Sequence, residues 1–324
     1  MTRFVVRRLL WAGALLLGVH LVTFMLFTVL PSADPASLRA GRSGDPQVLA
    51  AIRAELGLDK PAPVQYARSL ERAVLHFDLG SSYASGSREP VTAELGERMP
   101  VTLGLTVGAV LVWLVVAVPT GVLSAIRPRS LLERLLMVAV LVAISAPVYW
   151  LGLVALYLFS DDIGTLLPVF HGAGSYVPFA QSPGDWLQSL MLPWLVLAAS
   201  FAALYARLLR STLMDTLGQD YVRTARAKGL REREVVARHA LPPALTPVIT
   251  MLGIDVGALL GGAVLVEIVF NLPGIGRLAF DAVQNGDLPV VQGTVLFGAA
   301  CIVLANLAVD IAYAARDPRV GLRA

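Results

Sequence analysis

The residues with the clearest potential for chemistry lie in a short basic segment in the second half of the chain. They are Asp220, Tyr221, Arg223, Thr224, Ala225, Arg226, Ala227, Lys228, Gly229, Leu230 and Arg231. Guanidinium and ammonium groups form strong charge-assisted hydrogen bonds with carboxylates. Small side chains such as alanine let another element approach closely, and Gly229 can end a helix because glycine adopts positive φ. The segment therefore predicts a helix over residues 222–228, a glycine break and a docking surface for another protein.

A second helix is predicted over residues 230–241, and Pro242 and Pro243 are expected to end it. The alternative interpretation is a basic loop held to anionic lipid, at about 1 kcal/mol per basic residue near the surface. Lipid attraction needs no helix break at a fixed position. The order of alanine, glycine and proline therefore favours a docking surface.

The elements that position this segment are apolar runs long enough to cross a bilayer. Of the 324 residues, 56% are hydrophobic and 15% are charged, whereas a soluble domain carries about 25% charged residues. A membrane span needs about 20 mostly apolar residues. Six runs meet this requirement: residues 9–30, 101–126, 135–159, 187–208, 245–269 and 290–314. The sequence therefore predicts an all-α polytopic membrane protein with six transmembrane helices, the first of them an uncleaved span.

Basic residues concentrate in alternating connections, which sets the expected orientation. The connection 209–243 is rich in arginine, whereas the connection 160–186 contains Asp161, Asp162 and Asp185 and no lysine or arginine. By the positive-inside rule, both termini and the basic connection face the cytoplasm. The expected organisation is an N-terminal cytoplasmic stretch with the first span (residues 1–30), an external segment (31–100), a five-helix core (101–316) that contains the cytoplasmic loop 209–243, and a cytoplasmic tail (317–324).

The external segment, residues 31–100, is expected to contain helices of its own. Helical periodicity over residues 45–56 and 64–77 predicts two helices in the external segment.

Neither of the two lysines follows a glycine, so the chain lacks the Gly-Lys-Ser/Thr step of a P-loop. The four histidines do not form a His-Glu-x-x-His pattern, and the single cysteine excludes a disulfide within the chain. We expect no catalytic residue, metal site, cofactor or nucleic-acid partner in this chain.

The string Tyr-Val-Arg-Thr-Ala-Arg-Ala-Lys-Gly-Leu at residues 221–230 resembles the cytoplasmic loop of ABC importer permeases, in their dipeptide, oligopeptide and nickel branch. Other segments resemble the same branch in the same order. They are Leu-Gly-Leu-Asp-Lys-Pro at 56–61, Asp-Leu-Gly-Ser-Ser-Tyr at 78–83, Leu-Gly-Gly-Ala-Val-Leu-Val-Glu at 260–267, Phe-Asn-Leu-Pro-Gly-Ile-Gly at 270–276, Pro-Val-Val-Gln-Gly at 289–293 and Asp-Pro-Arg-Val at 317–320. The resemblance covers nearly the whole chain and is greatest to the first of the two permease subunits. The chain departs from the pattern at Thr224, where a glutamate is usual, and at Pro243, an additional proline.

The resemblance implies a type I ABC importer permease fold in the bacterial cytoplasmic (inner) membrane. The expected partners are a second permease subunit, two ATP-binding subunits that hold the ATP, an extracytoplasmic substrate-binding protein and membrane lipid. The solute would be a di- or oligopeptide, with nickel or another small solute as the alternative. Residues 217–243 would couple the ATPase subunits to the spans, with Arg226, Lys228 and Arg231 pairing with acidic ATPase residues. A self-sufficient secondary transporter and an intramembrane enzyme are the competing classes, and the sequence offers each of them little support.

Three further residues, Asp255, Glu267 and Asn271, are candidates for the translocation pathway. A carboxylate within a span costs roughly 2.5–3.5 kcal/mol to insert. Asp255 therefore either meets the amino group of a peptide or is a hydrogen-bonded structural carboxylate. Glu267 either contacts a docked binding protein or caps the turn expected at residues 271–276. The spacing of Gly253, Gly257, Gly261 and Gly262 allows close helix packing, either with the partner permease or within this chain.

Overall fold

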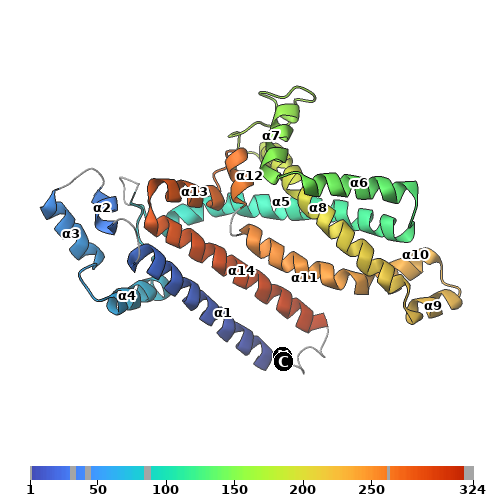
Figure 1. Cartoon of the computed structure of the whole chain (residues 1–324), viewed down its shortest axis with the longest axis horizontal. Helices are drawn as coiled ribbons and strands as arrows, with labels where there is room; N and C mark the ends of the chain where they lie inside the picture. The colour runs from blue at the N-terminus through green and yellow to red at the C-terminus, as the bar shows by residue number, and fades with distance from the viewer. Residues whose placement is uncertain (1, 30–33, 41–44, 84–88, 261–262, 317–324) are drawn as a thin grey trace. The chain divides into compact units, whose positions relative to one another are not determined.

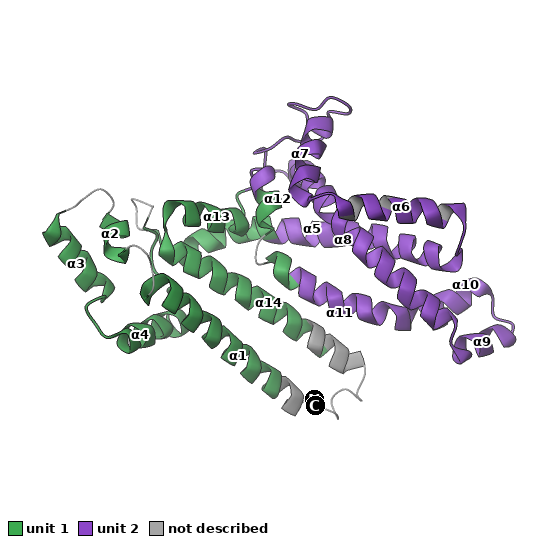
Figure 2. Cartoon of the chain, viewed as in Figure 1, with its two compact units in different colours: residues 1–102, 257–267, 273–324 green, residues 103–256, 268–272 purple. Residues whose placement is uncertain are grey.

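The computed structural model of the chain describes residues 2–29, 34–40, 45–83, 89–260 and 263–316. Its elements are the helices α1 to α14 and two π-helical segments, η1 and η2 (Figure 1). In these ranges the only β-type backbone pairing consists of two isolated bridges, Ser81 with Pro90 and Ser160 with Phe170. The predicted all-α class is therefore confirmed. The chain divides into two compact units (Figure 2). Unit 1 comprises Met1–Thr102, Gly257–Glu267 and Pro273–Ala324, and unit 2 comprises Leu103–Val256 and Ile268–Leu272.

Unit 1 contains the helices from both ends of the chain. They are α1 (Thr2–Phe24) with its continuation η1 (Met25–Val29), α2 (Pro35–Ala40), α3 (Pro46–Leu56), α4 (Ala62–Leu75), the start of α5 (Val91–Ile126), most of α12 (Val264–Val269), α13 (Ile275–Asn285) and α14 (Leu288–Arg316). Helices α1 and α13 each pack against α14. A buried cluster that includes Val91, Ile275, Leu278 and Val290 joins α5, α13 and α14. Burial of such side chains stabilises by about 1.5–3 kcal/mol each, so this cluster fixes the three helices together.

Unit 2 contains the middle of the chain. It comprises the remainder of α5, α6 (Leu131–Ser145), α7 (Val148–Phe159), α8 (Pro183–Leu217), α9 (Asp220–Ala227), α10 (Glu232–Glu234), η2 (Val235–Ala240) and most of α11 (Leu241–Leu260). Helix α8 packs against both α6 and α7. The buried Trp113 of α5 stacks on Phe201 of α8, with ring centroids 4.6 Å apart. Helix α8 is therefore the central element of this unit.

The long apolar helices match the predicted membrane spans. In the described ranges, five helical stretches are long and apolar enough to cross a bilayer: Val6–Val29, Val91–Ile126, Pro183–Leu217, Glu232–Leu260 and Leu288–Ala308. The third predicted span is instead two shorter helices, α6 and α7. Pro147 separates them, because a proline disfavours helical backbone in the preceding residue, and Ala146 is extended (φ −92°, ψ 130°). The apolar regions therefore agree with the predicted six-helix class, with one span divided.

Two boundaries around α11 differ from the prediction. Pro242 and Pro243 do not end a helix, because α10, η2 and α11 follow one another without interruption. The π-helical turn η2 precedes them, and the Leu241 N–H donates to the Val236 carbonyl five residues back. Prolines have no N–H to donate, and we attribute their tolerance here to the wider turn. The predicted end of the fifth span at residue 269 was also wrong, since α11 ends at Leu260 and α12 is a separate short helix.

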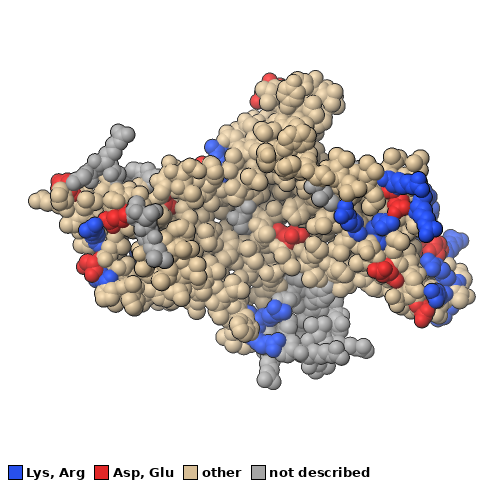
Figure 3. Space-filling view, viewed as in Figure 1, with Lys and Arg blue, Asp and Glu red and all other residues tan. Residues whose placement is uncertain are grey.

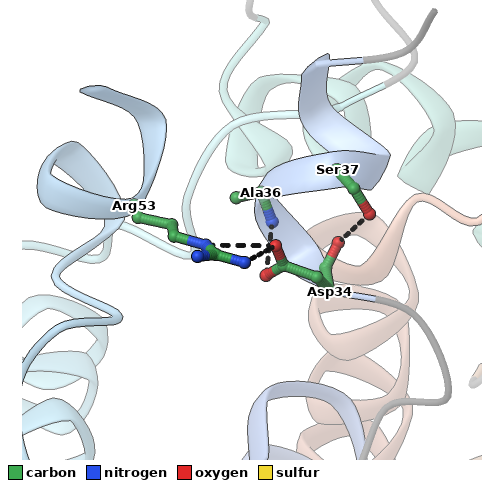
Figure 4. A network of polar contacts seen from close by, with 4 residues as sticks. All are labelled: Asp34, Ala36, Ser37 and Arg53. Carbon is green, nitrogen blue, oxygen red and sulfur yellow. Dashed lines mark hydrogen bonds and ion pairs between the residues drawn. The ribbon is translucent and has the colours of Figure 1, made fainter. Parts of the chain in front are cut away.

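The two helices predicted in the external segment are present as α3 and α4. A polar network around Asp34 joins α2 to α3 (Figure 4). Arg53 donates to Asp34 Oδ2 from Nε (3.2 Å) and Nη2 (2.8 Å), and the Ala36 N–H donates to Oδ1 (3.2 Å). The hydrogen bond from Arg53 lowers the pKa of Asp34. The predicted tail, residues 317–324, lies outside the described residues.

Candidate functional site

The basic segment folds as a helical bracket, formed by α9, the turn at residues 228–231, α10 and η2. Helix α9 ends at Ala227, and the N–H of Gly229 donates to the Arg226 carbonyl over 2.9 Å. Gly229 has a φ of +81°, and a Cβ added there would meet nothing within 4 Å. The glycine is therefore required by the backbone conformation of the turn and not by crowding.

The inner face of the bracket is an apolar contact between α9 and η2. Val222 and Ala225 of α9 are buried, as are Val235 and Ala240 of η2. The two elements pack against each other. Ala225, predicted on the docking surface, thus lies on the inner face, where its small side chain allows close packing within the chain.

The outer face carries the other ten predicted residues, all of them exposed. They are Asp220, Tyr221, Arg223, Thr224, Arg226, Ala227, Lys228, Gly229, Leu230 and Arg231. Lysine and arginine side chains gather around α9, α10 and the connection between α5 and α6 (Figure 3). The bracket therefore exposes more basic than acidic side chains and has an apolar interior.

Arg226 is already engaged within the bracket. Its guanidinium forms a two-point ion pair with Glu232, with Nε–Oε2 at 3.0 Å and Nη2–Oε1 at 2.7 Å. Arg223 lies 3.4 Å from Asp220 in an exposed pair. Lys228 and Arg231 have no side-chain partner among the described residues. The pairing of Arg226 with an acidic ATPase residue, expected from the resemblance, would have to compete with Glu232.

A second ion pair, not predicted from the sequence, connects α6 to α8 beside the bracket. Arg210 of α8 donates to Glu133 of α6, whose other carboxylate oxygen accepts from the Arg129 N–H (2.5 Å). That backbone hydrogen bond, followed by the contact with Arg210, lowers the pKa of Glu133. Ser130 caps α6 by accepting from the Glu133 N–H (3.1 Å). The Ser-x-x-Glu spacing was a visible capping signal, but nothing in the sequence indicated Arg210 as the partner.

Asp255 accepts a hydrogen bond from the hydroxyl of Tyr205, over 2.6 Å. Tyr205 is buried and lies against Trp113, with ring centroids 5.6 Å apart. Asp255 itself is half-buried. One of its oxygens is thus held by α8, and the geometry fits both roles left open by the sequence.

Glu267, in α12, is fully buried, and its carboxylate lies beside the start of α13. One carboxylate oxygen accepts from the Thr102 hydroxyl (2.8 Å) and the other from the Arg277 N–H (2.9 Å). The Ile275 N–H donates in turn to the Thr102 hydroxyl oxygen (2.9 Å). A carboxylate at this position accepts from N–H groups that have no partner within the helix, and its negative charge interacts favourably with the positive N-terminal end of the helix dipole. Of the two roles considered, the structure supports the cap.

Asn271 lies in the expected turn before α13. Its φ is +52°, a left-handed conformation that asparagine tolerates better than most residues. The preceding carbonyl, of Phe270, accepts from the N–H of Gly174 over 3.0 Å. A Cβ on Gly174 would lie 2.8 Å from the Asn271 side-chain nitrogen, so the connection between α7 and α8 packs directly on this turn.

Gly257 allows a close helix contact within the chain. A Cβ at this position would lie 2.9 Å from the Ile302 Cα and 3.1 Å from the Ala305 Cβ, both in α14. Close approach of backbones is what small residues permit between membrane helices. The structure therefore supports packing within the chain for Gly257, whereas Gly261 and Gly262 lie outside the described residues.

Apolar helices of membrane-spanning length, together with a basic helical bracket between two of them, define a polytopic membrane protein. The chain belongs to the family described as binding-protein-dependent transport system inner membrane components. The model of that family matches residues 117–322, and the model of its N-terminal component matches residues 1–106. The chain is therefore a multi-pass inner membrane permease of the ABC importer class.

Curated relatives match the chain along its whole length. A Brucella abortus protein named "Putative peptide transport system permease protein" is 41% identical over 320 residues, covering 99% of each chain. The glutathione transport system permease protein GsiC of Salmonella typhimurium is 40% identical over 320 residues, again covering 99% of each. A Brucella suis protein named "Putative peptide permease protein" is 39% identical over 323 residues.

Proposed function

We propose that this chain forms the translocation pathway for di- or oligopeptides as one permease subunit of an ATP-driven importer. Relatives named for peptide transport and for the transport of glutathione, itself a tripeptide, support this solute class. Their identity of 40–41% over 99% of both chains makes a shared architecture the simplest explanation. Nickel or another small solute is the alternative within the same machinery.

The proposed complex contains a second permease subunit, two ATP-binding subunits and an extracytoplasmic substrate-binding protein, within membrane lipid. ATP would bind to the ATPase subunits, and this chain would itself contribute no cofactor site or catalytic residue. Both termini would face the cytoplasm, as the distribution of arginine favours. This arrangement places the basic bracket on the same side of the membrane as the ATPase.

The observation that carries the coupling proposal is the construction of the bracket. Its outer face is exposed and basic, whereas its inner face is held to η2 by buried Val222 and Val235. From η2 the chain runs directly into α11, the helix that carries Asp255. A rigid helix transmits a displacement along its length, as alternating access between two states requires. Movement of an ATPase subunit against α9 would thus reach the membrane through packed helices.

Asp255 is the proposed pathway residue of this chain. A half-buried carboxylate in a membrane helix usually faces a water-filled cavity or the interior of the bundle. Its Oδ2 accepts a hydrogen bond from Tyr205, and the other oxygen, Oδ1, would accept from a peptide ammonium. Glu267 and Asn271 would act indirectly, by holding the start of α13 and the turn that precedes it.

The test is ATP-dependent uptake of labelled di- and oligopeptides into proteoliposomes that contain the whole complex. Gly229→Pro is incompatible with the positive φ of the turn, and it removes the N–H that donates a hydrogen bond to the Arg226 carbonyl. Gly57→Pro is the matched control, because Gly57 also has positive φ (+68°), has an N–H that donates at a helix end, and has no atom near its absent Cβ. We expect Gly229→Pro to abolish uptake and peptide-stimulated ATP hydrolysis in an assembled complex, and Gly57→Pro to preserve coupling. Unchanged uptake by Gly229→Pro would reject the bracket as the coupling element.

A further inference from the structure

Unit 1 contains a cavity whose lining includes neither the bracket nor the proposed pathway residues. It has a volume of about 540 Å³ and lies between α1, the external helices α3 and α4, and the start of α14. Polar side chains make up much of its lining, among them His20 of α1, Arg68 and Arg72 of α4, and Gln292 of α14. A volume of this size is typical of sites for small molecules.

His20 is the first indication of a ligand. Its side chain is 4% exposed, and its Nε2 lies 3.3 Å from the Ser69 hydroxyl. Its other ring nitrogen, Nδ1, is buried and has no hydrogen-bond partner among the described residues. Buried polar atoms in folded proteins are nearly always paired, so His20 brings an unsatisfied polar group to the wall of the cavity.

Two arginines of α4 are the second indication. Arg68 and Arg72 are four residues apart, so they lie on the same face of the helix. Both line the cavity, and neither has an ion-pair partner in the described part of the chain. The carboxylates of Glu71 and Asp78 line the same cavity. This lining suits a ligand that carries a phosphate and a cationic group together.

The third indication is the position of the cavity beside the membrane. His20 and Phe24 belong to the membrane-length stretch Val6–Val29, and both rings contact Tyr66 of α4, with centroids 5.4 and 5.5 Å away. Helix α4 therefore lies alongside the final part of a membrane span.

The end of α4 is also unusually apolar for a surface exposed to water. Val74 is 57% exposed and Leu75 68%, and Phe77, just beyond the helix, is 78% exposed. On α1, Leu21, Met25 and Leu26 are exposed as well. Basic residues next to exposed apolar side chains are typical of helices at a membrane interface, where charged heads reach polar groups and apolar side chains meet acyl chains.

We propose that this cavity binds the headgroup of an ethanolamine phospholipid. The phosphate is held by Arg68 and Arg72, the ammonium by Glu71 and Asp78, and the acyl chains run along the exposed face of α1. The lipid would then join the external segment to the first span. A phosphate ligand could also come from solution, as free phosphoethanolamine or inorganic phosphate, so the test includes both sources.

The experiment is native mass spectrometry of the purified importer complex, titrated with dioleoyl-phosphatidylethanolamine or dioleoyl-phosphatidylglycerol. The variant Arg68→Gln/Arg72→Gln removes both proposed phosphate contacts. The charge-matched control is Lys60→Gln/Arg98→Gln, two changes in unit 1 that lie outside the cavity lining. We expect roughly 30-fold weaker ethanolamine lipid binding in the cavity variant, from about 1 kcal/mol per basic residue, and near wild-type binding in the control. Glu71→Gln should reduce the preference for the ethanolamine lipid over the glycerol lipid.

Three results would overturn the proposal. Equal lipid binding by wild type and Arg68→Gln/Arg72→Gln, with both complexes assembled, would exclude the arginines as the site. Equal losses in the cavity and control variants would show that surface charge alone attracts lipid. Displacement of the lipid by phosphoethanolamine or inorganic phosphate at comparable concentrations would identify a soluble ligand instead.

Discussion

Arg226 and Glu232 form a two-point ion pair that closes the bracket between α9 and α10. Both side chains are substantially exposed, and exposed ion pairs contribute about 0.2–1 kcal/mol. We therefore expect Arg226→Ala and Glu232→Ala each to lower coupled peptide uptake by no more than roughly fivefold. The charge exchange Arg226→Glu/Glu232→Arg should restore much of the loss. If Arg226 instead pairs with the ATPase, the exchange will be worse than either single change.

Much of the fold could be predicted because an apolar run of about 20 residues indicates a membrane-spanning helix by its length and composition alone. The bracket was visible from Gly229 and from the alternation of small and basic residues. The burial of Val222 and Ala225, three residues apart on one face of α9, was also within reach of helical periodicity. The sequence did not indicate that the helix continues across Pro242 and Pro243 after the π-helical turn η2, because such a turn has no clear local signature.

Contacts between distant residues account for what the sequence left open. Glu133 and Arg210 are separated by 77 positions, and Thr102 and Glu267 by 165. Neither spacing nor composition identifies such partners. For Glu267, the two roles could be separated only once the fold brought Thr102 and the start of α13 together.

The pair formed by Glu133 and Arg210 predicts a stability that depends on pH. The pKa of Glu133 is lowered in the folded state, so its contribution is fully present above the ordinary glutamate pKa of about 4.3 and is lost as the pH falls through the lowered value. We expect Glu133→Gln to lower the Tm of the complex at neutral pH, and the difference from wild type to shrink in acid. Thermal unfolding between pH 7 and the lowest pH at which the complex stays assembled measures this. A constant difference across the range would contradict the assignment.

The cap on α13 predicts that Thr102 and Glu267 act together. Thr102→Val removes the hydroxyl that links the Ile275 N–H to the Glu267 carboxylate. Leaving buried polar groups unpaired costs about 1–3 kcal/mol, so the Tm should fall. Asp281→Asn is the control on the same helix, because Asp281 lies in a long surface pair with Arg277 (3.7 Å). A Thr102→Val complex as stable as Asp281→Asn would show that the cap contributes little.

The proposed role of Asp255 predicts a dependence on the peptide amino terminus. Asp255→Asn removes the charge and should raise the KM for peptides with a free amino group far more than for N-acetylated peptides. Tyr205→Phe removes only the hydroxyl that donates to Asp255, and it should leave that discrimination largely intact. Uptake assays with matched free and acetylated peptides make the comparison. Parallel losses for both peptides in both variants would mean that Asp255 is purely structural.

The central claim is that the outer face of α9 contacts an ATPase subunit, and photo-crosslinking tests it most directly. Tyr221 is 48% exposed on that face, so replacing it with p-benzoylphenylalanine places a reactive group on the proposed contact. Phe179, 60% exposed in the connection between α7 and α8, is the control position. The account predicts an adduct with the ATPase subunit from position 221 and none from position 179. Adducts at position 221 with lipid alone, in a complex that contains the ATPase, would contradict it.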